Sequence, residues 1–180
     1  KDKIMQNVML DLETMGTSSD CAIVSIGAVK FDRDFGIIER FYTTISLQSS
    51  MDKGFSISGG TITWWLGQSE EARKELKGAK TTIKEALKNF QAWLPKENFQ
   101  IWGNGSDFDN VILQNAFKRF NVENPWPFWS NRCFRTFKYS FPEVEGVVKP
   151  TVAHKAVDDA QYQAEYLVAL VNKYKLNDVI

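Results

Sequence analysis

The sequence predicts an α/β fold in which helices flank a mixed central β-sheet. Two runs rich in β-branched and aromatic residues, 21–32 and 36–47, follow an apolar run at 5–11 and have the length of strands. From residue 61 onward, apolar residues recur mostly at helical spacing, and a short strand-like run at 98–103 interrupts them. Three consecutive strands followed by alternating helices and strands indicate an antiparallel meander joined to further parallel strands.

Turn and capping signals justify these elements in order. The residues "RDFG" (33–36) between the second and third runs are typical of a hairpin turn. The polar stretch 48–60 is expected to be a loop, of a length that is usually functional or mobile. The expected helices are one or two short ones within 61–76, one at 81–94 capped by Thr81 or Thr82, and three more at about 107–120, 131–140 and 157–174.

Length and composition indicate one globular domain. The chain has 180 residues, of which 43% are hydrophobic, and this suffices for a buried core. No stretch approaches the roughly 18 uninterrupted apolar residues of a membrane span, and the start lacks a signal-peptide pattern, so we expect a cytoplasmic protein without a membrane partner. The two cysteines lie far apart and are expected to be reduced thiols. Residues 1–4 are interpreted as an N-terminal extension or a cloning remnant, and 5–180 as the domain.

The net charge is zero, but basic residues gather in one stretch. Residues 118–155 hold seven Lys and Arg against three Asp and Glu. If some of the chain's acids bind metal ions, the remaining surface is more positive than the total suggests. The charge therefore neither requires nor excludes a nucleic-acid partner.

Acidic residues follow the first strand. Asp11 and Glu13 alternate along it, so their side chains leave one face near its C-terminal end, where open α/β sheets place ligands. Two close carboxylates repel each other unless a cation neutralises them. Taken alone, such a pair also fits ordinary solvated charges at a strand end.

Two further acidic clusters change this interpretation. Asp107 and Asp109 lie where a helix begins after the 98–103 strand, although an acid there can simply cap the helix. His154, the only histidine, precedes Asp159 by five residues at the start of the last helix, so the two side chains can meet in one pocket. Asp158 is the adjacent alternative.

Three motifs in this order resemble the exonuclease motifs of the DEDDh family, whose fold is ribonuclease H-like. They span residues 8 to about 170 and read "DLET", "FDNVIL" and "HKAVDDA". Finer details resemble a branch that includes phage exonuclease A, exonuclease VIII-like and mycobacterial exoribonuclease-like proteins; these details are "MGT", "TITWWLGQSEEAR" and "WGNGSDFDN". The resemblance implies a two-metal-ion 3′–5′ exonuclease that releases nucleoside 5′-monophosphates.

The resemblance also implies a role for each motif residue. It makes Asp11, Glu13, Asp109 and Asp159 the ligands of two Mg²⁺ or Mn²⁺ ions, and His154 the general base. Asp109 is chosen because it follows Phe108 as the motif requires, and Asp159 because of its five-residue offset from the histidine. Asp107 and Asp158 are the replacements if either choice is wrong.

Substrate-binding residues are expected around these motifs. Thr14 and Met15 follow Glu13 and are placed to touch the terminal nucleotide, and Phe108 belongs to the second motif. Single strands are commonly held by base stacking and cationic side chains, so we add Trp64, Trp65 and Arg135. Core packing and a solvated helix face explain these last three residues as well.

The expected partner is the 3′ end of single-stranded DNA, with RNA 3′ ends or overhangs as the alternative. No residue declares itself as a reader of the 2′-hydroxyl group that would separate the two. A catalytically silent ribonuclease H-like binding module is the rival from another class, but it predicts a missing acid or histidine and all five positions are filled. No polymerase-docking tail is evident after the last helix, and the sequence leaves the oligomeric state open.

Overall fold

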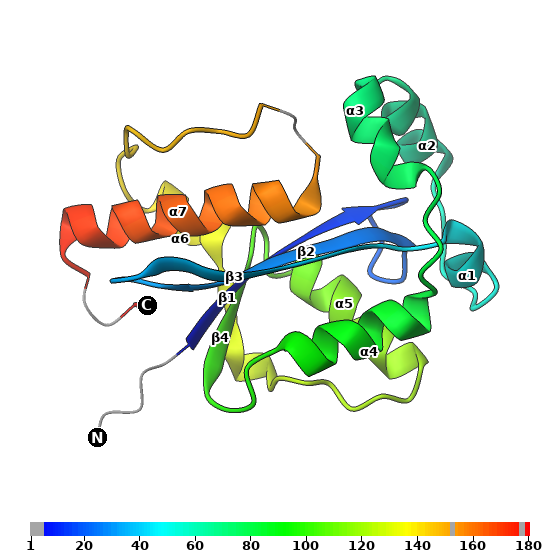
Figure 1. Ribbon diagram of the computed structural model, residues 1–180, viewed down its shortest axis with the longest axis horizontal. Coiled ribbons are helices and arrows are strands. Elements are labelled where there is room, and N and C mark those ends of the chain that lie inside the picture. The colour runs from blue at the N-terminus through cyan, green and yellow to red at the C-terminus, as the bar shows by residue number, and fades with distance from the viewer. Residues whose placement is uncertain (1–5, 152–153, 177–178) are drawn as a thin grey trace.

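Five strands of the computed structural model, which describes residues 6–151, 154–176 and 179–180, form one mixed sheet in the order β3-β2-β1-β4-β5. Neighbours β1, β2 and β3 pair antiparallel, whereas β4 and β5 run parallel to β1. The strands are β1 (Gln6–Thr14), β2 (Ile23–Asp32), β3 (Gly36–Thr44), β4 (Phe99–Gly103) and β5 (Asn131–Cys133). The predicted α/β fold with a meander and parallel strands is therefore confirmed (Figure 1).

Helices cover both faces of this sheet. The long helix α7 lies on one face together with α6, and α4 and α5 lie on the other (Figure 1). The helices are α1 (Leu47–Met51), α2 (Gly59–Leu66), α3 (Glu70–Arg73), α4 (Ile83–Trp93), α5 (Asp109–Arg119), α6 (Phe134–Tyr139) and α7 (Ala156–Tyr174), with short 3₁₀ turns at Lys74–Leu76 and Phe128–Ser130. Thr82 caps α4 as one of the two expected residues, because its side chain accepts a hydrogen bond from the Glu85 N–H.

Two expected elements were wrong in part. The stretch 48–60 is a loop only in its middle, since α1 occupies its first four residues and α2 begins at Gly59, with Ser46 and Ser58 as the caps. The expected helix at 131–140 begins as strand β5, which pairs with β4 from Ile101 to Gly103. That pairing is a contact with a distant segment, so local periodicity did not reveal it.

The alternation of β1 decides which face each side chain joins. Leu10 and Leu12 pack in the core cluster that contains α4 and α5, whereas Met9 packs in the cluster that contains α7. Because side chains alternate along a strand, Asp11 and Glu13 share the α7 face with Met9. The central strand of the sheet thus carries both acids toward the start of α7.

A glycine allows α7 to approach the sheet at this place. Gly27 of β2 is the register partner of Asp11, and a Cβ on Gly27 would lie 2.1 Å from the carbonyl carbon of Ala156. Only a residue without a side chain fits under the first turn of α7. The first turn of α7 is therefore held beside Asp11.

The thiols and the helices can be compared with the expectations from composition. Both Cys21 and Cys133 are free. Among the described residues, no helix combines the length and the apolar character needed to span a membrane. Residues 1–4, interpreted as an extension or remnant, lie outside the described residues, as does Met5, where the first strand was expected to begin.

Candidate functional site

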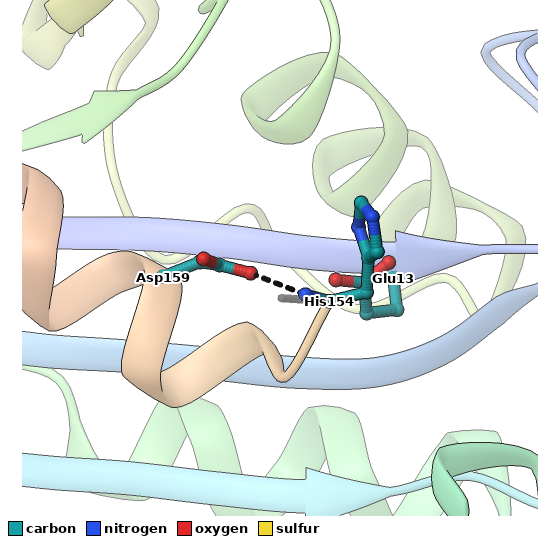
Figure 2. A group of neighbouring side chains, drawn as sticks. All are labelled: Glu13, His154 and Asp159. Atoms are coloured by element: carbon teal, nitrogen blue, oxygen red, sulfur yellow. Dashed lines mark hydrogen bonds between the residues drawn. The ribbon is translucent and has the colours of Figure 1, made fainter. Parts of the chain in front are cut away.

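A cavity of about 650 Å³ opens where β1 and β4 end and α7 begins. Its walls include all four carboxylates expected from the motifs and the single histidine, which come from four parts of the chain. These residues are Asp11, Glu13, Asp109, His154 and Asp159. Residues up to 148 positions apart in sequence are thereby gathered on one cavity, and Figure 2 shows three of them.

The two acids of β1 differ in their partners. Asp11 Oδ1 accepts a hydrogen bond of 2.8 Å from Nε2 of Gln163 in α7. Glu13 is only 8% exposed, yet no hydrogen bond or ion pair with a described residue reaches its carboxylate. A buried carboxylate without a partner is unfavourable, so a cation beside Glu13 would stabilise its ionised form.

Asp109 is positioned by the difference in length between β1 and β4. Strand β4 ends at Gly103, opposite Leu10, so β1 continues without a neighbour on that side. There the Leu12 N–H donates a 3.1 Å hydrogen bond to Asp109 Oδ1, which occupies the place of the missing strand. A Cβ on Gly103 would lie 2.3 Å from Asn110 Oδ1, so glycine is needed for α5 to begin this close.

His154 and Asp159 are connected through the backbone. The His154 N–H donates a 3.0 Å hydrogen bond to Asp159 Oδ2, and His154 has a left-handed φ of 66° (Figure 2). The imidazole meets the ring of Trp64 edge-to-face, with 4.8 Å between ring centroids. One ligand atom each of Glu13, His154 and Asp159 lies within 4.8 Å of the other two.

Burial raises the pKa values of all four carboxyl groups, and repulsion among them adds to the shifts of Asp11 and Glu13. Burial raises the pKa of Asp11 well above its usual range, and the charges of Asp109 and Glu13 act in the same direction. Burial, followed by the charge of Asp159, raises the pKa of Glu13 to about 8. Burial raises the pKa of Asp109 to about 7 and also raises that of Asp159, although backbone hydrogen bonds oppose both shifts. The cavity therefore disfavours four negative charges unless cations join them.

The neighbouring alternatives lie outside this cavity. Asp107 is exposed and does not line it. Asp158 forms ion pairs with Arg40 and, at 3.3 Å, with Lys155. The geometry thus brings Asp109 and Asp159, rather than their neighbours, to the other acids.

Sequence reasoning missed two residues beside the acids. Gln163, which holds Asp11, lies one helical turn after Asp159, and this i,i+4 spacing was the available signal. Glu75 is 6% exposed and accepts a hydrogen bond from the Tyr42 hydroxyl group, and its charge contributes to the raised pKa of Glu13. Glu75 lies in a charged stretch whose pattern gave no sign of burial.

A second cavity of about 420 Å³ adjoins the first and shares Leu12, Glu13 and Phe108 with it. Its lining is mostly apolar and includes Thr14 and Trp64, whose side chain is 45% exposed. Three of the expected substrate-binding residues, Thr14, Trp64 and Phe108, therefore surround one hollow beside the carboxylates.

Two other expected binding residues are buried, which corrects those expectations. Trp65 is 2% exposed, and its Nε1–H donates a 3.0 Å hydrogen bond to the Thr14 carbonyl oxygen. Met15 is 5% exposed and packs in the core. Neither side chain offers a free surface to a base, because adjacent positions face different directions and these two face inward.

Cationic side chains border the first cavity on the α6 side. Arg135, which was expected to bind substrate, lines it together with Lys138. Arg132 instead donates hydrogen bonds to the carbonyl oxygens of Trp129 and Asn131. Of the basic side chains near α6, Arg135 and Lys138 are the two that reach the acids' cavity.

Comparisons with known proteins find two similarities in sequence. The model of the 3′–5′ exoribonuclease Rv2179c-like domain matches residues 6–171. A protein of Enterobacteria phage T4 named exodeoxyribonuclease is 24% identical over 192 residues, which cover 86% of this chain and 84% of that protein.

Solved structures share the fold at low sequence identity. A zinc-bound E. coli exonuclease I complex with single-stranded DNA superposes with a TM-score of 0.72 at 14% identity, over 96% of this chain and 42% of that one. The complex of the same enzyme with a dT13 oligonucleotide gives 0.69 at 16% identity, over 97% and 43%. Cell-death related nuclease 4 gives 0.62 at 17% identity, over 93% and 64%. The chain spans less than half the length of exonuclease I.

Proposed function

The chain belongs to the Rv2179c-like 3′–5′ exoribonuclease domain family, and on this premise we propose that residues 5–180 act as one domain that degrades single-stranded DNA from its 3′ end. Membership makes the chain a 3′–5′ exonuclease of the DEDDh type that acts on nucleic acid. The proposed products are nucleoside 5′-monophosphates. The observation that carries the proposal is the convergence of four carboxylates and the single histidine on one cavity.

The residues around the cavity fit hard divalent cations. The four carboxylates offer only oxygen ligands, which Mg²⁺ and Mn²⁺ prefer, and Glu13 is buried without a partner. We assign Asp11, Glu13, Asp109 and Asp159 to hold two such ions. When bound, the ions supply neutralising charge at the phosphate and lower the pKa of the attacking water.

The chain's own residues then orient the reaction. His154 lies at the cavity beside Glu13 and Asp159, where its imidazole can accept the proton of the attacking water. The hydrogen bond from the His154 N–H to Asp159 and the contact with Trp64 restrict the position of the imidazole. Gln163 keeps the Asp11 carboxylate turned toward the cavity.

The second cavity is the proposed place of the 3′-terminal nucleoside. Thr14, Trp64 and Phe108 surround it directly beside Glu13, and apolar walls suit a base and sugar. Arg135 and Lys138 line the first cavity and not the second, so they can contact phosphates of the remaining strand.

DNA is favoured by the names and ligands of similar proteins. The phage relative is named exodeoxyribonuclease, and the exonuclease I structures contain DNA oligonucleotides. The description of the family, an exoribonuclease domain, favours RNA as the second candidate. Both substrates would use the same acids, and the group that separates them at the 3′-terminal sugar is the 2′-hydroxyl.

The test uses two 5′-labelled single strands of one sequence, one DNA and one RNA, with Mg²⁺, Mn²⁺ or EDTA. We expect a ladder of single-nucleotide steps from the 3′ end, faster on DNA, that disappears with EDTA and with Asp11→Ala. A faster ladder on RNA would replace DNA by the second candidate. Binding without cleavage of either strand would favour the silent binding module instead.

A further inference from the structure

We infer that Glu13, His154 and Asp159 form a Zn²⁺ site in which the imidazole is a ligand, and that Zn²⁺ bound there inhibits the nuclease. The binding half of this inference stands on the three side chains alone. The inhibitory half rests on the function proposed above, in which His154 accepts a proton.

The three side chains already lie at ligand separations. One ligand atom of each is within 4.8 Å of the other two, and they come from β1, from the segment before α7 and from α7 itself (Figure 2). The hydrogen bond between the His154 N–H and Asp159 Oδ2 fixes the two residues relative to each other. Trp64, with its ring centroid 4.8 Å from that of His154, restricts the imidazole further.

The environment of Glu13 points independently to a cation. Its carboxylate is 8% exposed, and the described residues give it no hydrogen bond and no ion pair. The charged groups that act on it are the carboxylates of Asp159, Glu75 and Asp109. An ion beside Glu13 would offset the burial and the repulsion that disfavour its ionised form.

The ligand set selects the kind of cation. Two carboxylate oxygens and an imidazole nitrogen suit Zn²⁺, whereas Mg²⁺ prefers oxygen ligands alone. Zn²⁺ commonly takes three protein ligands and leaves a fourth position open. A given nitrogen and oxygen site also generally binds Zn²⁺ more tightly than Mn²⁺. Zn²⁺ is therefore expected to bind here at concentrations far below those needed for Mg²⁺ or Mn²⁺.

Inhibition follows from the use of the same atoms. An imidazole nitrogen whose lone pair is bound to Zn²⁺ cannot accept a proton from water. Glu13 and Asp159 would at the same time be withheld from the ions that support the reaction. Zn²⁺ thereby converts the proton acceptor of the site into a ligand.

A single histidine makes the binding test unambiguous. Because His154 is the only histidine of the chain, the imidazole signals in a ¹H–¹⁵N spectrum belong to it. At constant pH and without nucleic acid, one equivalent of Zn²⁺ is expected to shift one ring nitrogen strongly, and excess Mg²⁺ is not. Histidine signals unmoved by Zn²⁺ would overturn the site.

Calorimetry with matched variants supplies the second readout. His154→Asn is suitable because asparagine tolerates the left-handed backbone of this position. We expect it to weaken Zn²⁺ binding at least about tenfold, as the loss of a direct ligand should. Cys133→Ser is the control, because it removes a half-buried thiol that could bind Zn²⁺ but lies outside the proposed site. We expect it to keep the wild-type affinity. Equal affinities of wild type and His154→Asn would also overturn the site.

The activity arm separates the two halves of the inference. Zn²⁺ added to the Mg²⁺-activated wild type is expected to stop cleavage with a midpoint near the calorimetric Kd, and a chelator with excess Mg²⁺ is expected to restore it. A Zn²⁺-shifted histidine with unchanged cleavage would overturn inhibition alone. If the wild type cleaves neither DNA nor RNA before Zn²⁺ is added, the proposed function fails while the spectrum still decides the Zn²⁺ site.

Discussion

The two halves of the carboxylate cavity are held in place by different means. Asp11, Glu13 and Asp109 belong to a strand-borne half, because β1 is the central strand and Asp109 is bonded to its Leu12 N–H. His154 and Asp159 form a helix-start half, positioned by one backbone hydrogen bond, one ring contact and the packing of α7 on Gly27. The strand-borne half should thus tolerate changes of charge without loss of structure, whereas the helix-start half depends on a few contacts between distant segments.

Asp11→Asn is expected to have the largest effect on activity. It removes a charge from the strand-borne half while the new side chain still offers an oxygen to Gln163. Activity should fall by about 10⁴-fold, as is typical when one member of a cooperating catalytic group is lost. Thermal stability in EDTA should stay the same or rise, since repulsion with Glu13 and Asp109 is relieved. Ladder assays and thermal melts measure both, and a large loss of stability would contradict rigid placement by the strand.

His154→Asn tests the chemical role of the helix-start half without disturbing its backbone. Loss of a general base should lower kcat by about 10²–10⁴-fold, with little change in stability because asparagine accepts the positive φ. His154→Val is the contrasting variant, since a β-branched residue in this conformation should lower the unfolding free energy by about 1–3 kcal/mol. Equal stability of the two variants in urea would show that the backbone at 154 relaxes freely.

Gly27→Ala is expected to displace the helix-start half while the strand-borne half stays in place. The added Cβ would meet the Ala156 carbonyl carbon at 2.1 Å, so α7 must move or the sheet must deform. We expect the unfolding free energy to fall by about 1–3 kcal/mol, as for other overpacked sites. The His154 imidazole signals should move, and urea unfolding measures the stability. Ala28→Gly is the control, because Ala28 lies on the other face of the same strand and its change should leave the His154 signals in place.

Gln163→Leu is expected to have a smaller effect, because it removes a contact between the two halves. The change removes the hydrogen bond from α7 to Asp11 and fills a similar volume. Loss of such a supporting contact typically weakens metal binding or activity about tenfold or somewhat more. A higher Mg²⁺ requirement with kcat largely kept at saturating Mg²⁺ is the expected signature. An unchanged Mg²⁺ dependence would mean that Gln163 does not position Asp11.

The pH dependence of stability should reveal the repulsion in the strand-borne half. The pKa values of Glu13 and Asp109 are raised to about 8 and about 7, so the folded state holds protons that the unfolded state releases. In EDTA, the contribution of these two groups to stability should therefore be greatest below about pH 4 and be lost as the pH rises through about 7 and 8. Mg²⁺ should reduce this fall, and Asp109→Asn should also make it shallower. Thermal melts from pH 5 to 8.5 measure it; a rise in stability over this range in EDTA would contradict the shifts.

Local patterns in the sequence sufficed for most elements and for the acids themselves. An apolar run specified β1, runs of β-branched and aromatic residues specified β2 and β3, and Thr82 and the spaced apolar residues specified α4, because these features act within one or two turns of the chain. Alternation along β1 was enough to place Asp11 and Glu13 on one face. The resemblance to the family's motifs also singled out Asp109 and Asp159, which the structure brings to the cavity in place of Asp107 and Asp158.

Tertiary structure decided what depends on distant segments. Trp64 and Trp65 are adjacent and chemically alike, but only the packing of α2 against Thr14 buries one ring and exposes the other. Residues 131–133 become a strand because β4 offers them an edge, and Glu75 is buried because Tyr42 meets it. The sequence thus determined which groups this protein possesses and their local conformation, whereas long-range packing determined which of them share a cavity, since burial and pairing are properties of contacts between distant segments.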